Sequence, residues 1–117
     1  MPAMAKLLIV EDDESVRTLA ARALERAGHT IDIAADGAQG LSLIQAAHGR
    51  YDLVVSDIRM PEMDGIEMAI AAAAMFPSMK IMLMTGYADQ RERAHGLDAL
   101  VHDVIAKPFS LDQIKGA

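Results

Sequence analysis

The chain has 117 residues, no cysteine and a formal net charge of −6. This length predicts a single domain with a real core, and the lack of cysteine excludes disulfides, thiolate metal sites and cysteine nucleophiles. The acidic balance offers no basic surface for nucleic acid, and no apolar run approaches the roughly 18 residues that a membrane span needs. With no secretory leader ahead of the first apolar run, we expect a cytoplasmic domain that contacts neither nucleic acid nor membrane directly.

The first half of the chain alternates between short apolar runs and helical patterns. An apolar run at residues 6–11 predicts a strand, and apolar residues at helical spacing over 16–27 predict a helix. Gly28 follows as a C-terminal stop signal. A second apolar run at 29–34 leads into a weaker helical pattern over 37–47.

The second half repeats this alternation. The apolar run at 52–57 precedes a clean helical stripe over 66–74. A fourth run at 80–85 leads to a less regular helix over 90–100, and a fifth at 103–107 precedes a short C-terminal helix. Five strand–helix units of this kind predict a parallel α/β sheet with helices on both faces.

Acidic residues stand where the predicted strands end. The first strand ends in Glu11 and Asp12, and the third ends in Asp57. Because the carboxyl ends of parallel strands share one edge of the sheet, we expect these three side chains to meet there. The next two acids, Asp13 and Glu14, are better explained as the start of a helix, where acids cap free N–H groups and favour the helix dipole.

This grouping predicts a chemistry. Neighbouring carboxylates repel one another, so a cation is expected among them, and oxygen ligands suit Mg²⁺ better than zinc. The fourth and fifth strands end in Thr85 and Lys107, whose hydroxyl and ammonium groups suit phosphoryl oxygens. An aspartate next to Mg²⁺, a threonine and a lysine predicts an aspartyl phosphate, with the Asp57 carboxylate as the nucleophile.

Four motifs carry a family resemblance: "IVEDD", "SDIRMPEMDG", "MLMTGY" and "AKPF". In this order and spacing they resemble the receiver domain of bacterial two-component response regulators, over nearly the whole chain. The resemblance implies a (βα)5 fold, which is a flavodoxin-like, doubly wound parallel sheet with strand order 2-1-3-4-5. It also implies that a histidine kinase or a histidine phosphotransfer protein donates a phosphoryl group to Asp57.

The resemblance assigns the remaining roles. Mg²⁺ is expected at Glu11, Asp12, Asp57 and the backbone carbonyl of Arg59, with Asp12 as a direct ligand and Glu11 acting through water. Thr85 and Lys107 are expected to bind the new phosphoryl oxygens. Their movement would change the surface formed by the fourth helix, fifth strand and fifth helix, where a downstream protein binds.

The chain departs from the family pattern at Val104 and over residues 93–104, which lack the small-residue pattern that commonly leads into the fifth strand. Val104 stands where most receivers carry an aromatic switch residue, and Tyr87 is the nearest candidate to replace it. The last residues, "FSLDQIKGA", allow at most two turns of the fifth helix. We therefore expect a receiver domain over residues 1–117 whose fifth helix is truncated, with its natural end or an output domain beyond residue 117.

The motif details also suggest a narrower group and some alternatives. They are most similar to stand-alone, single-domain alphaproteobacterial receivers that act by protein contact. The family implies signalling rather than enzyme activity, with slow self-dephosphorylation because the small Gly86 leaves the phosphoryl group open to water. The alternatives are a pseudo-receiver that acts without phosphorylation and a haloacid dehalogenase-like phosphatase. Arg59 argues against the phosphatase, because that family needs an acid two residues after its nucleophile.

Overall fold

The computed structural model describes residues 4–60, 62–85 and 103–106. Five parallel strands form one sheet in the order β2-β1-β3-β4-β5, which confirms the predicted fold class and strand order. The predicted fourth and fifth helices lie outside the described residues. The described elements, in chain order, are β1 (Lys6–Val10), α1 (Glu14–Arg26), β2 (Thr30–Ala34), α2 (Gly37–Ala46), β3 (Leu53–Asp57), α3 (Gly65–Met75), β4 (Ile81–Thr85) and β5 (Asp103–Ala106).

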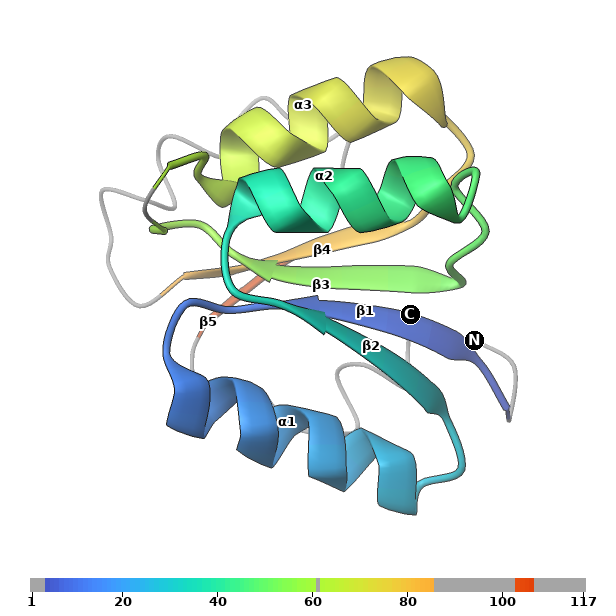
Figure 1. The fold of residues 1–117 in the computed structure, drawn as a ribbon, viewed down its shortest axis with the longest axis vertical. Coiled ribbons are helices and arrows are strands. Elements are labelled where there is room, and N and C mark those ends of the chain that lie inside the picture. Colours follow the sequence, from blue (N-terminus) through green and yellow to red (C-terminus); the bar gives the residue numbers. More distant parts are fainter. Residues whose placement is uncertain (1–3, 61, 86–102, 107–117) are drawn as a thin grey trace.

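Helices cover both faces of this sheet (Figure 1). Helix α1 lies on one face, and α2 and α3 lie together on the other. Alternate residues of β1 accordingly enter two separate cores: Leu8 and Val10 pack on the α2 and α3 side, and Leu7 and Ile9 on the α1 side. This double covering explains why β1 and β3 are apolar almost throughout, as parallel strands between two helix layers are.

An aspartate caps the start of each described helix. The side chain of Asp13 accepts a hydrogen bond from the Val16 N–H, which confirms that this acid begins α1. Asp36 and Asp64 do the same for α2 and α3. Each such cap satisfies a backbone donor that the helix leaves open and contributes about 1 kcal/mol. The caps therefore fix where α1, α2 and α3 begin, next to the carboxyl edge of the sheet.

The apolar stripe of α1 is only partly buried. Ala20, Ala21 and Leu24 face the sheet, whereas Val16 is 39% and Leu19 is 73% exposed. Small alanines at the contact let the helix lie close to the sheet. The larger apolar residues of the first two turns consequently remain at its outer surface.

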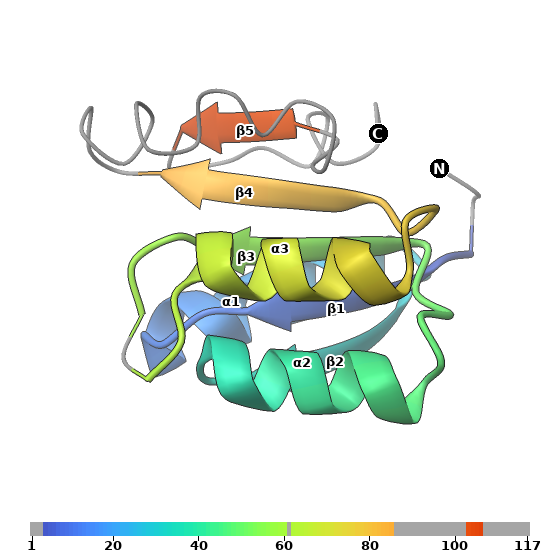
Figure 2. The ribbon, with the colours of Figure 1, turned by 90° about the horizontal axis from the view of Figure 1, so that it is seen from above.

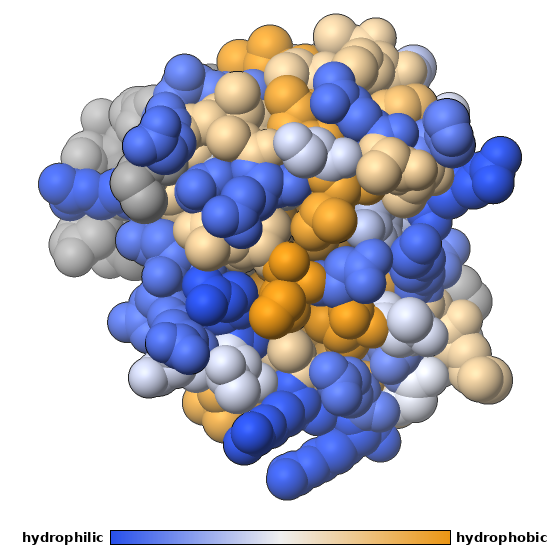
Figure 3. Space-filling model, in the orientation of Figure 1, coloured by the Kyte–Doolittle hydropathy of each residue, from blue (hydrophilic) through white to orange (hydrophobic). Residues whose placement is uncertain are grey.

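The described surface mixes polar and apolar side chains. In the view of Figure 3, apolar side chains gather over α2 and β2, and Ile33 of β2 is 48% exposed. Strand β2 is less buried than its neighbour β1 because it lies at one edge of the sheet (Figure 2). None of the helices in the described part of the chain is both long and apolar enough to cross a membrane.

A buried tyrosine ties the edge strand to the rest of the sheet. The Tyr51 hydroxyl, just before β3, donates a 2.7 Å hydrogen bond to the carboxylate of Asp32 on β2. Tyr51 is 5% exposed, and the Lys6 ammonium lies 5.0 Å from the centroid of its ring. Burial, followed by the hydrogen bond and negative charge of Asp32, raises the pKa of Tyr51 well above its usual range. The phenol therefore stays protonated in the folded protein.

The substitution Tyr51→Phe keeps the aromatic ring and removes the hydrogen bond to Asp32. We expect the free energy of unfolding at neutral pH to fall by about 1 kcal/mol, measured by urea denaturation. Above about pH 10, the ordinary pKa of tyrosine, the unfolded wild type loses the proton that its folded state keeps. The advantage of the wild type should therefore shrink as pH rises beyond this value. A difference that stayed constant into strongly alkaline solution would contradict this assignment.

Candidate metal and phosphoacceptor site

Three carboxylates meet at the carboxyl edge of the sheet. Val10 of β1 pairs with Ser56 of β3, so the residues that follow each of them reach the same place. Oxygens of Glu11, Asp12 and Asp57 lie within 4.8 Å of one another. The structure therefore brings together the three acids that the sequence placed at strand ends.

The three acids differ in their exposure. Glu11 is 1% and Asp57 is 6% exposed, whereas Asp12 faces solvent. Glu11 is held on two sides, because its Oε1 accepts a hydrogen bond from the Asp13 N–H at 3.2 Å and its carbonyl accepts one from Arg17 Nη1 at 2.9 Å. The site thus has a fixed, buried floor and one acid at its solvent-facing side, where an ion or a phosphodonor can enter.

Backbone and side-chain contacts support the buried Asp57. The Ser56 hydroxyl donates to the Asp57 carbonyl at 2.9 Å, and the Ile58 N–H donates to the Met84 carbonyl at 3.2 Å. Gly65, the first residue of α3, lies so close that an added Cβ would overlap the Asp57 carbonyl oxygen. Gly65 is not among the residues that the sequence predicts for this site. Its position directly after the helix cap was the signal that could have indicated it.

The remaining predicted site residues are described to different extents. The Arg59 side chain is exposed, between the buried residues Ile58 and Met60. Thr85 ends β4, the strand next to β3, and its backbone pairs with that of Ala106 on β5. Strand ends therefore place Thr85 at the same sheet edge as Asp57. The predicted roles of Lys107 and Tyr87 fall on residues outside the described part of the chain.

The donor set suits a hard divalent cation. All three groups are carboxylates, two of them are buried, and their mutual repulsion in a low dielectric is costly without a positive charge. Mg²⁺ and Ca²⁺ are bound by oxygen ligands of this kind, whereas zinc in proteins prefers nitrogen and sulfur. The residues present therefore fit a site for a divalent metal ion.

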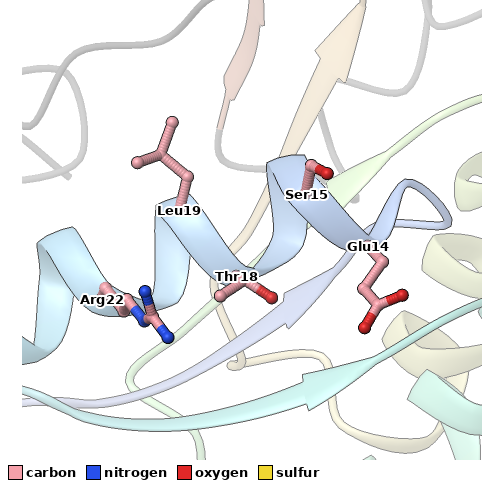
Figure 4. Close-up of a pocket in the computed structure, with 5 residues that line it drawn as sticks. All are labelled: Glu14, Ser15, Thr18, Leu19 and Arg22. Carbon is pink, nitrogen blue, oxygen red and sulfur yellow. The ribbon is translucent and has the colours of Figure 1, made fainter.

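A separate depression lies on the outer surface of α1. It shares no residue with the acid cluster and is lined by Glu14, Ser15, Thr18, Leu19 and Arg22 (Figure 4). Leu19 extends from the helix on the side away from Thr18 and Arg22 in that view. The depression is thus an open feature of the helix surface, and the acid cluster is a distinct one.

Comparison with known proteins identifies the family. Residues 7–117 match the family model of the response regulator receiver domain. The chain is 36% identical over 109 residues to the response regulator MprA of a Mycobacterium species, covering 93% of this chain and 46% of the relative. It is 36% identical over 110 residues to the sensor kinase CckA of Brucella abortus, covering 94% of this chain and 12% of that protein.

Solved structures agree with this assignment. This chain resembles the response regulator TrrA of Thermotoga maritima, solved in complex with Mg²⁺ and BeF, with a TM-score of 0.83 and 31% sequence identity. The match covers 97% of this chain and 95% of TrrA. The chain belongs to the response regulator receiver family, so it is a phosphoacceptor domain of two-component signalling rather than a member of an enzyme family. It spans about half the length of the MprA relative.

The acid cluster gives a direct prediction for metal binding. Saturating MgCl₂ should raise the unfolding temperature of the wild type, because an ion that binds only the folded state stabilises that state. At a free Mg²⁺ concentration of one hundred times Kd, the free energy of unfolding should rise by about 2.7 kcal/mol. Asp12→Asn should lose most of this increase, while unfolding no earlier than the wild type without metal because repulsion is relieved. Thermal unfolding followed by circular dichroism measures both effects.

Glu14→Gln is the matched control, because it removes one negative charge two residues further along the chain. It should respond to MgCl₂ as the wild type does. An equal metal-induced rise in Asp12→Asn and in the wild type would exclude the acid cluster as the metal site.

Proposed function

We propose that Asp57 is the residue of this receiver that accepts the phosphoryl group. Its burial at the end of β3, with the carboxylates of Glu11 and Asp12 within 4.8 Å, is the observation that carries the proposal. A carboxylate at this place lies next to the solvent-facing Asp12 and is fixed by the packing of β3. It therefore meets the geometric requirement for a nucleophile that attacks an incoming phosphorus atom.

The proposed metal is Mg²⁺, bound by Asp12, Asp57 and the carbonyl of Arg59, with Glu11 acting through water. When bound, this ion neutralises charge on the acids and on the transferring phosphoryl group. The TrrA relative was solved with Mg²⁺ and BeF, which supports the same ion here. The chain's own contribution is to hold the Asp57 oxygen in line, as the P–N bond of a phosphohistidine breaks and the O–P bond forms.

Thr85 and Lys107 are the proposed switch residues. Their hydroxyl and ammonium groups would bind the new phosphoryl oxygens and draw the ends of β4 and β5 toward Asp57. Coupling between two sites is typically about 1–3 kcal/mol, which suffices to change a partner's affinity. Because Val104 replaces the usual aromatic switch residue, Tyr87 is the proposed substitute for it. The proposed binding surface for the downstream protein is formed by the fourth helix, β5 and the fifth helix.

The partners and cell compartment complete the proposal. A histidine kinase or histidine phosphotransfer protein is the proposed phosphodonor, and the relative CckA is itself named a sensor kinase. The proposed output is contact with a downstream protein in the cytoplasm, with no direct binding of nucleic acid or membrane by residues 1–117. A truncated fifth helix and a stand-alone alphaproteobacterial regulator stay predictions, and an output domain outside residues 1–117 is the alternative to the stand-alone form.

Incubation with acetyl phosphate or beryllofluoride in the presence of Mg²⁺ tests the phosphoacceptor directly. Acetyl phosphate should add one phosphoryl group to the wild type, as measured by intact mass, and either reagent should move the backbone amide shifts around Asp57. Asp57→Asn should show neither change, because an amide oxygen is a poor nucleophile. Asp52→Asn is the matched control, because it makes the same substitution directly before the first residue of β3, at the other end of the strand from Asp57. It should behave as the wild type does. Identical results for the wild type and Asp57→Asn would favour a pseudo-receiver.

The same phosphorylated protein tests self-dephosphorylation. Gly86 follows Thr85 and carries no side chain that could shield the acyl phosphate from water. We expect the phosphoryl group to be lost within hours in Mg²⁺ after removal of acetyl phosphate, measured by intact mass over time. Gly86→Val should slow this loss by covering the phosphoryl group. An acyl phosphate that persisted for days in Mg²⁺ would contradict this expectation.

A further inference from the structure

The loop between Asp57 and α3 is fastened by backbone hydrogen bonds. The Ile58 N–H donates to the Met84 carbonyl of β4, and the Gly65 N–H donates back to the Ile58 carbonyl at 2.8 Å. A further bond comes from a different element, because the Gly37 N–H donates to the Met63 carbonyl at 3.0 Å. The loop that contains Arg59 is thus attached to the first residue of α2.

Gly37 leaves no space for a side chain. A Cβ at this residue would overlap the Met63 carbonyl oxygen, and it would lie 2.9 Å from the Met63 carbonyl carbon and 3.0 Å from its Cγ. The first two neighbours are backbone atoms, which cannot turn aside as the end of a flexible side chain can. Any residue larger than glycine at position 37 therefore requires α2 and the loop to move apart.

Of these two elements, the loop is the one that can move. Helix α2 is anchored by its cap, in which the Asp36 carboxylate accepts from the Gln39 N–H at 2.8 Å, and by the fully buried Ile44. The loop packs Met60 and Met63 against the core, but it exposes Arg59 and Glu62 and lies outside any described helix or strand, so it lacks the repeating hydrogen bonds that hold α2. A side chain at Gly37 would hence displace the loop next to Asp57.

We propose that Gly37 is a positioning residue for the metal site. By admitting the Met63 carbonyl, it fixes the loop and with it the Arg59 carbonyl relative to Asp57. This inference rests on the proposed function, in which that carbonyl is a metal ligand. The residue itself contacts neither metal nor phosphoryl group, and its effect reaches the site through the backbone of the loop.

The simplest rival is a purely structural role in helix packing. In that case a side chain at residue 37 lowers stability and leaves metal affinity unchanged. Gly49 provides the matched comparison, because an added Cβ there would overlap the ring of the partly buried Phe76, and its positive φ of 70° disfavours other residues. It lies between α2 and β3, at the opposite end of the sheet from the acids.

The test compares Gly37→Ala and Gly49→Ala with the wild type in a Mg²⁺ titration followed by backbone amide shifts. Urea denaturation of each variant measures its loss of stability separately. We expect Gly37→Ala to bind Mg²⁺ about tenfold more weakly, as changes next to a metal's ligands commonly cause. Gly49→Ala should lose stability and keep the wild-type affinity. Acetyl phosphate should label Gly37→Ala slowly at low Mg²⁺ and at nearly the wild-type rate at high Mg²⁺.

A measurement on the wild type decides the matter even if Gly37→Ala fails to fold. The Gly37 amide should shift with the same Mg²⁺ dependence as the Arg59 amide, whereas the Gly49 amide should not respond. The inference about Gly37 would be overturned, with the proposed function left standing, if Gly37→Ala bound Mg²⁺ with wild-type affinity. It would also be overturned if the Gly37 amide of the wild type did not shift with Mg²⁺ while the Arg59 amide did. A wild type that bound no Mg²⁺ would overturn the proposed function and this inference with it.

Discussion

Mutual repulsion among three carboxylates is the constraint on which the rest of this structure depends. Their oxygens lie within 4.8 Å of one another, and two of the side chains are almost fully buried. Like charges this close repel one another, so the packing of the backbone has to hold the three side chains together. Here β1 and β3 are adjacent, apolar and covered by helices on both faces, so the residues that follow Val10 and Ser56 are delivered to one point. The stability of the core thus maintains an arrangement that a cation or phosphoryl chemistry can use.

Much of the fold follows from the sequence because the central strands are uninterrupted apolar runs. The five described strands begin and end within one residue of the predicted bounds, and Gly28, with a φ of 100°, follows α1 where a stop was expected. The burial of α1 was less predictable. Apolar periodicity treats Val16 and Leu19 like Leu24, although alanines make the close contact with the sheet and leave Val16 partly and Leu19 largely exposed.

The site was predictable to the extent that it depends on strand ends. A parallel sheet brings its carboxyl ends to one edge, so Glu11, Asp12 and Asp57 could be grouped without coordinates. The attachment of Gly37 to Met63 could not, because it joins the first residue of α2 to a loop residue and the spacing of the two carries no pattern. A glycine in a sequence indicates either an unusual backbone conformation or a place with no room for a side chain. Only the folded structure shows which neighbouring atom leaves no such room.

The bond between Tyr51 and Asp32 has a consequence for how copies of this protein meet. Strand β2 lies at the edge of the sheet, and an edge strand offers backbone groups to which a strand from another molecule can add. Asp32 is the middle residue of that strand, and the tyrosine bond holds its negative charge in place. In an antiparallel pairing of two such strands about their centres, the two charges would face each other. The bond that secures the edge from within therefore also discourages aggregation from outside.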